Sequence, residues 1–199
     1  PPQREERKVI VPFDANPSLI IGFHKPAPPS DDDYALDVLE TILSKGRTSR
    51  LYAGLVSDKK IADSISVHNG MPAARFPNLF AIFARPRHPH TNAELRDAIF
   101  HELEAIRENP VSEQELAKAK NQMKMDYIRS LDSNAELASI LSYYELLLGD
   151  YRYFSTYLSR INRISAQDIQ KAAERYLVAE NRTVALLATE KKVTNQNEP

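Results

Sequence analysis

The histidines are the residues of this sequence best suited to chemistry, because imidazole both binds metal ions and transfers protons near neutral pH. His101 is followed by Glu102, which matches the start of the H-E-x-x-H helix of zinc enzymes. The second histidine of that pattern is missing, since Ala105 stands in its place. One ring beside one carboxylate does not make a zinc site, so we expect His101 on the surface of an amphipathic helix.

The other histidines do not complete a metal site either. His88 and His90 flank Pro89, which should hold this stretch extended and direct the two rings to opposite sides. A zinc site there would need a third and a fourth ligand, so a solvated loop is the better interpretation. His24 and His68 stand at the ends of expected strands without a partner in sequence. We therefore predict no metal ligand and no catalytic residue in this chain.

Several other function classes are disfavoured by composition. The chain has no cysteine, which excludes thiolate nucleophiles, thiolate zinc sites and disulfide scaffolds. It contains no G-x-S-x-G, Walker A or G-x-G-x-x-G motif. A formal net charge of −1 argues against nucleic acid as the main partner, and no apolar run approaches the roughly 20 residues that span a membrane. The tyrosines between positions 143 and 157 have helical spacing, which favours helix packing over a ligand cage.

The placement of proline divides the chain into two parts. Twelve of the 13 prolines lie at or before Pro110, whereas residues 111–198 hold no proline and one glycine, Gly149. Helix interiors exclude both residue types, so the second part should be mostly helical and the first should carry strands and turns. Apolar spacing predicts strands over 8–13, 18–24, 61–68 and 79–84, and helices over 35–43 and 49–57.

Capping patterns mark the helices of the second part. Thr91 with Glu94, Ser112 with Glu115, and Ser165 with Asp168 each have the spacing of a capping box. The segment from Ser30 to Asp33 should supply the N-cap side chain and the first-turn negative charge of the first helix. Further helices are expected over 134–148 and 153–161, and a last strand over 183–187. In the helix 134–148, five residues are expected to face inward: Leu137, Ile140, Leu141, Tyr144 and Leu148.

These elements predict an α+β fold. We expect a two-layer sandwich in which a largely antiparallel sheet of about five strands carries its helices on one face. Residues 8–189 should form a single domain. Residues 1–7 have the composition of an interdomain linker, and residues 190–199 that of a disordered tail.

The order of the motifs resembles that of a known family. Residues 46–52, which read Gly-Arg-Thr-Ser-Arg-Leu-Tyr, resemble the "S-S-R-L-y" signature of the pitrilysin-type, or mitochondrial-processing-peptidase-like, zinc peptidases. The helix start at 111–122 and the segment from Ile164 to Thr183 are similar to two further motifs of that family. We therefore interpret Gly46, Ser49, Arg50, Leu51 and Tyr52 as a structural signature.

The resemblance implies a non-catalytic role for this chain. Members of the family usually carry paired homologous domains, and the first holds an H-x-x-E-H motif whose residues bind zinc and activate water. This sequence contains no H-x-x-E-H, so it resembles the second, inactive C-terminal domain. Zinc is then expected in the N-terminal half of the parent protein and not in this chain. The resemblance does not fix a compartment; bacterial relatives are periplasmic or cytoplasmic.

Two positions depart from the pattern of many relatives. In those relatives an arginine soon after the signature and a tyrosine seven residues later reach the bound peptide. The corresponding positions here are Val56 and Asp63, and neither can donate a hydrogen bond to developing negative charge. We therefore predict that the substrate-binding function of this pair is lost.

Three functions remain open on the sequence. The first is the inactive domain of a zinc metallopeptidase, which closes the substrate chamber and packs against the catalytic N-terminal half or a homologous partner subunit that carries the Arg/Tyr pair. Its peptide substrates would then belong to the parent enzyme. The second is an assembly scaffold related to the core proteins of the respiratory cytochrome complex. The third is a small hydrolase that uses His88, His90 or His101.

Overall fold

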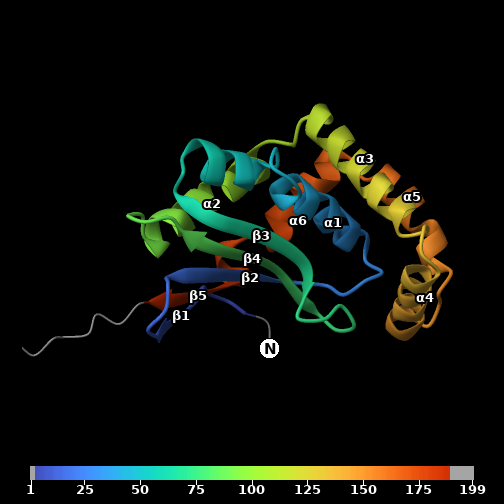
Figure 1. The fold of residues 1–199 in the computed structure, drawn as a ribbon, viewed down its shortest axis with the longest axis horizontal. Coiled ribbons are helices and arrows are strands. Elements are labelled where there is room, and N and C mark those ends of the chain that lie inside the picture. The colour runs from blue at the N-terminus through green and yellow to red at the C-terminus, as the bar shows by residue number, and fades with distance from the viewer. Residues whose placement is uncertain (1–2, 189–199) are drawn as a thin grey trace, which may run out of the picture.

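The computed structural model describes residues 3–188, which form a sheet layer and a helix layer (Figure 1). The strands are β1 (Arg7–Pro12), β2 (Ser18–Lys25), β3 (Ala62–Met71), β4 (Asn78–Pro86) and β5 (Arg182–Ala188). The helices are α1 (Asp31–Ser44), α2 (Asn92–Glu108), α3 (Glu113–Arg129), α4 (Asn134–Leu148), α5 (Tyr153–Arg163) and α6 (Ala166–Tyr176). A π-helical segment, η1 (Tyr52–Asp58), and a 3₁₀ turn, η2 (Ala179–Asn181), complete the described chain.

The five strands form one mixed sheet in the order β1-β5-β2-β4-β3. Three pairings, β2 with β4, β2 with β5, and β3 with β4, are antiparallel, as expected. The fourth differs, because β1 and β5 are parallel. The turn at Asn16 and Pro17 joins β1 to β2 but does not form a hairpin, since β5 lies between these two strands. The last strand of the described chain therefore joins two strands from its beginning.

A bulge near the start of strand β3 changes which of its first residues is buried. Ile65 and Val67 are buried on one face, as their spacing predicts. Ile61, the first residue of the predicted strand, lies before the observed strand and is only half-buried. The pairing with β4 shifts between Ala62 and Ser64, so Ala62 takes the buried position in its place.

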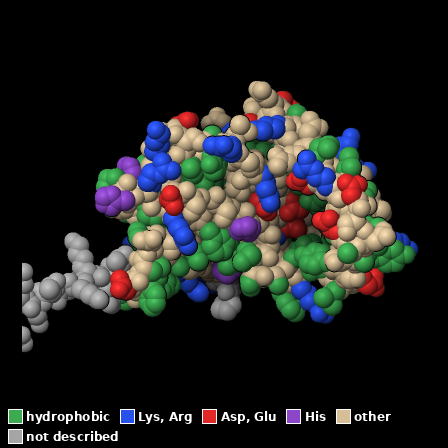
Figure 2. Space-filling model, in the orientation of Figure 1, with side chains coloured by type: hydrophobic (Ala, Val, Ile, Leu, Met, Phe, Trp, Pro, Cys, Tyr) green, Lys and Arg blue, Asp and Glu red, His purple; other side chains and the backbone are tan. Residues whose placement is uncertain are grey.

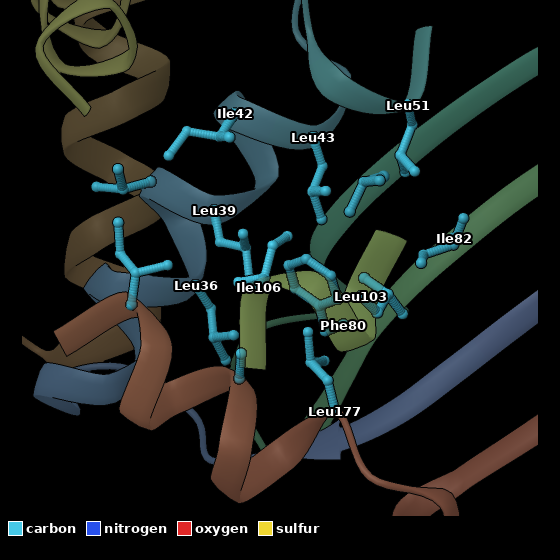
Figure 3. Packing of buried hydrophobic residues seen from close by; sticks show 14 of the residues in the cluster. Leu36, Leu39, Ile42, Leu43, Leu51, Phe80, Ile82, Leu103, Ile106 and Leu177 are labelled. Carbon is cyan, nitrogen blue, oxygen red and sulfur yellow. The ribbon is translucent and has the colours of Figure 1, made fainter. Parts of the chain in front are cut away.

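The core lies between the sheet and helices α1, α2 and α6 (Figure 3). Leu36, Leu39 and Leu43 of α1 point toward Phe80 and the neighbouring side chains of the sheet. All four of these side chains are fully buried. Helix α1 thus runs across the middle of the helix layer, and the i, i+3, i+7 spacing of its apolar residues explains this position.

Three of the expected helix caps are present. The capping boxes at Thr91, Ser112 and Ser165 are all complete. At α1 the three acidic residues lie in the first turn, as expected, but the expected side-chain cap is absent, because Ser30 makes no cap hydrogen bond. Asp33 instead forms a buried ion pair with Lys25 of β2, so its carboxylate is engaged elsewhere.

Helix α4 differs from its prediction. It lies at the end of the molecule farthest from β1, beyond α3 and α5 (Figure 1). None of its residues is buried. The five side chains expected to face inward are only half-buried, namely Leu137, Ile140, Leu141, Tyr144 and Leu148. Local spacing identified the helix, but the body of the protein does not cover its apolar face.

Residues 3–6 lie beside β5. The Gln3 side-chain amide donates to the Arg182 carbonyl at 2.5 Å, and Glu6 forms an ion pair with Arg182. Arg7, which we assigned to a linker, belongs to β1. The interdomain role of residues 1–7 remains a prediction, and the tail 190–199 lies outside the described residues. Within residues 3–188, no helix has both the length and the apolar character needed to cross a bilayer.

Candidate functional site

The signature segment 46–52 forms a turn that joins α1 to η1. Gly46 adopts a positive φ of 85°, a conformation that L side chains rarely take, so this position favours glycine. The Ser49 hydroxyl donates to the Gly46 carbonyl at 2.7 Å, and Ser49 is buried. Leu51 is also fully buried in the core, whereas Tyr52 is half-buried against it. These residues shape and anchor the turn.

Arg50 connects the signature segment to the start of α3. Its Nε and Nη2 atoms donate to the two carboxylate oxygens of Glu115 at 2.5 and 2.9 Å. Glu115 also accepts from the Ser112 backbone N–H at 3.0 Å, as part of the α3 capping box. Hydrogen bonds from Arg50 and Ser112 lower the pKa of Glu115 to about 2. Two of the motifs noted in the sequence therefore meet at one carboxylate.

Val56 and Asp63 occupy different environments. Val56 lies in η1, and its side chain is buried in the core. Asp63 is exposed on β3, at the bulge between Ala62 and Ser64. The buried Val56 side chain presents no polar group to a peptide, and the loss of the Arg/Tyr function remains a prediction.

The histidines are not brought together. His24 and His68 are exposed on β2 and β3, and the His68 ring packs edge-on against Phe83, with centroids 5.6 Å apart. His88 and His101 are also exposed. The Nδ1 atom of His90 lies 3.7 Å from a Glu94 carboxylate oxygen at the start of α2. Among residues 3–188, no group of three or more histidine, aspartate or glutamate side chains could hold a metal ion.

A buried polar cluster at α1 was missed in the sequence. Asp33 and Asp37, four residues apart, share one face of α1. The Asn69 amide nitrogen donates to carboxylate oxygens of both, at 3.1 and 2.8 Å. The Tyr157 hydroxyl donates to the other oxygen of Asp37 at 3.2 Å. Burial and the nearby Asp33 raise the pKa of Asp37 to about 7. The spacing of the two aspartates was the available signal, but we interpreted Asp33 only as part of the start of the first helix and did not single out Asp37.

The tyrosines near this cluster pack as predicted. The rings of Tyr144 on α4 and Tyr153 on α5 have centroids 5.2 Å apart, and Tyr144 lies 6.2 Å from Phe154. The hydroxyl groups of Tyr34 and Tyr153 are hydrogen-bonded to each other. Aromatic contacts therefore hold α4 against α5 and reach α1.

Residues 1–123 match the family model described as the peptidase M16 inactive domain. The chain belongs to this family. The matched region includes the signature segment 46–52 and the helix start at 111–122, so the resemblance indicated by those motifs is confirmed. The fold agrees as well, because solved members have the same arrangement of sheet and helices.

Three similar proteins define the relationship to this family. Zinc protease PqqE of Helicobacter pylori is 27% identical over 170 residues, which cover 85% of this chain and 37% of that protein. A protease structure from Helicobacter pylori has a TM-score of 0.88 at 25% identity and covers 94% of this chain and 45% of that one. An inactive peptidase domain from Bordetella parapertussis has a TM-score of 0.77 at 26% identity and covers 94% of this chain and 99% of that one.

A shorter match extends to a protein of a respiratory complex. Cytochrome b-c1 complex subunit 2 of Mus musculus is 26% identical over 84 residues, which cover 42% of this M16 domain and 18% of that protein. The chain spans less than half the length of the curated relatives that it matches.

Proposed function

We propose that this M16 domain is the non-catalytic half of a zinc metallopeptidase and that the open face of its sheet packs against the catalytic half to close a substrate chamber. The match of residues 1–123 to an inactive peptidase domain carries the proposal. The zinc protease relative from Helicobacter pylori supports a peptidase as the parent protein. Zinc would then be held by the catalytic half, which this chain does not contain.

The open face of the sheet is a surface against which the catalytic half could pack. In the described chain, the helices lie on the other face (Figure 1). The strand registers place Ser66, Phe83, Ile20, Ala185 and Val9 in one row across all five strands. Four of these five residues are apolar, and Ile20 and Val9 are 42% and 48% exposed, so much of the row's apolar surface is open to water. A sheet face of this composition gains free energy when a second protein surface covers it.

The experiment uses the full-length product of the gene, which we expect to carry both halves. Ile20→Asp places a charge in the middle of the open face and should lower zinc-dependent peptide cleavage at least tenfold. The control is Glu113→Gln, which removes an exposed carboxylate at the start of α3 on the helix side. Equal activity of the Ile20→Asp protein and the wild type would contradict the packing.

The isolated chain provides a second test. After purification and exposure to zinc, it should retain no stoichiometric metal by elemental analysis and should cleave no unfolded protein. Stoichiometric zinc together with peptidase activity would overturn the non-catalytic assignment and favour the hydrolase alternative. A full-length product that binds no zinc and cleaves no peptide would favour the assembly scaffold instead.

A further inference from the structure

A cavity of about 660 Å³ lies between α1 and helices α3, α4 and α5. Its size falls within the range typical of small-ligand sites, about 300 to 1,000 Å³. Figure 2 shows acidic and hydrophobic side chains gathered around a hollow in this half of the molecule. The cavity is lined mainly by aromatic rings and carboxylates. None of the three functions considered above, the inactive peptidase domain, the assembly scaffold or the small hydrolase, uses it.

The aromatic rings of the cavity can attract a cation. Five rings line it, those of Tyr127, Tyr143, Tyr144, Phe154 and Tyr157. The neighbouring pair Tyr34 and Tyr153 already holds a guanidinium, since Arg160 lies 5.5 and 5.4 Å from their ring centroids. In the described part of the chain, no lysine or arginine lies over any of the five cavity rings. Tyr127 and Phe154 stack on each other, with ring centroids 4.5 Å apart, so each of these two rings can offer only its other face to a ligand cation.

The charges of the cavity also favour a cation. Four carboxylates line it, those of Asp37, Glu40, Asp126 and Glu136, against one amine, that of Lys45. Lys45 pairs with Glu40 at 3.3 Å. The two hydrogen bonds that Asp37 accepts come from neutral groups, Asn69 and Tyr157. Asp37 and Glu40 are half-buried, whereas Asp126 and Glu136 are exposed, so the negative charge extends from the wall of the cavity to its rim, and water screens the inner part of it less than the outer part.

Asn69 provides a separate sign that a donor is missing. Its side-chain oxygen is buried and has no hydrogen-bond partner within the described residues. It lines a smaller cavity of about 200 Å³ that shares Asp37, Tyr144 and Tyr157 with the larger one. A buried acceptor without a donor is unfavourable, so an N–H group brought in by a ligand would be stabilised here.

From these observations we infer that the cavity binds the guanidinium group of an arginine side chain from a polypeptide. A guanidinium is planar, stacks on aromatic rings and donates to two carboxylate oxygens at once, which suits this lining better than the compact ammonium of lysine. A polypeptide fits better than free arginine because one lining residue, Tyr143 on α4, is apolar in its ring and 48% exposed, so a residue that flanks the arginine can pack against it.

The test is a titration of the full 199-residue chain with the peptide acetyl-Leu-Arg-Leu-amide, followed by NMR or calorimetry. The same peptide with citrulline in place of arginine should bind at least tenfold more weakly, because citrulline keeps the shape and loses the charge. Acetyl-arginine-amide should bind more weakly than the peptide. Equal binding of the arginine and citrulline peptides would overturn the inference, and a single residue that binds as well as the peptide would contradict the polypeptide ligand.

Two substitutions locate the site. Asp37→Asn should weaken binding of the arginine peptide at least tenfold, and Glu136→Gln, at an exposed position, should weaken it severalfold without disturbing the fold. The matched control Glu113→Gln lies outside the cavity lining and should bind like the wild type. If both cavity variants are folded by circular dichroism and retain full affinity, the inference fails. Neither zinc nor the catalytic half is needed, so this result is independent of the proposed function.

Discussion

Helices α1 and α4 have nearly the same length, 14 and 15 residues, and opposite environments. Nine residues of α1 are buried, whereas α4 has none. The difference does not come from a lack of apolar residues, because α4 contains five leucines and one isoleucine. It comes from position, since α1 crosses the sheet and α4 packs on α5 beyond its edge. Apolar spacing thus predicts that a helix forms but does not show whether the same chain covers it.

The largest expected effect on the free energy of unfolding comes from a leucine-to-alanine substitution in α1, and the same substitution in α4 serves as the comparison. Leu39→Ala in α1 removes a fully buried side chain and should lower the free energy of unfolding by about 3 to 5 kcal/mol. Leu146→Ala in α4 removes a side chain that is 71% exposed and should cost less than about 0.5 kcal/mol. Urea denaturation followed by circular dichroism measures both. A similar cost at the two positions would break the contrast between the helices.

A smaller effect on stability is expected from the titration of Asp37, which lies on α1 and lines the cavity between α1 and α4. Its pKa is raised to about 7, so between about pH 4 and pH 7 the folded state binds more protons than the unfolded state. Stability should therefore fall as the pH rises through this window, by on the order of 2 kcal/mol, and level off above it. The groups that face Asp37 are Asp33, Glu40, Lys25, Tyr144 and Tyr157.

Urea denaturation at a series of pH values checks this prediction. Asp37→Asn should flatten the decline, because asparagine does not titrate. Asp132→Asn, which changes an exposed carboxylate beyond α3, should leave it in place. A decline that persists unchanged in the Asp37→Asn protein would show that other groups cause it.

The smallest expected effect concerns the contact between Arg50 and Glu115. Arg50→Lys keeps the charge but loses the bidentate hydrogen bonding to Glu115. It should lower the free energy of unfolding by about 1 kcal/mol, because both side chains are partly exposed and water weakens their interaction. The lowered pKa of Glu115 stabilises the folded state above about pH 4, and this stabilisation should be lost as the pH falls toward 2. Arg47→Lys at an exposed position is the control.

A double-mutant cycle with Glu115→Gln measures the coupling between the two side chains. Additive effects of Arg50→Lys and Glu115→Gln on the free energy of unfolding would show that the pair does not act as a unit.

The sequence predicted those features that depend on neighbouring residues. The three capping boxes depend on contacts within a few positions, and the structure confirms them. The parallel pairing of β1 with β5 was missed because strand order depends on contacts between distant segments. The residues of the turn between β1 and β2 do not specify which strands become neighbours.

Polar contacts between distant segments could not be predicted from the sequence either. Arg50 and Glu115 stood in two recognised motifs, yet no local pattern predicts that residues 65 positions apart share two hydrogen bonds. The Asp33 and Asp37 pair had a visible spacing. Its partners Lys25, Asn69 and Tyr157 come from three other elements, so the cluster exists only once the helices and strands are assembled.

The strand order has a consequence for how the chain is made. During synthesis β2 leaves the ribosome early, but β5, which pairs along one of its sides, follows only after α1, β3, β4 and the remaining helices. Until then that side of β2 presents unpaired backbone groups to the crowded cell, together with its apolar residues. The nascent chain therefore passes through a stage open to wrong strand pairing, and chaperone protection during translation would have its greatest value in that interval.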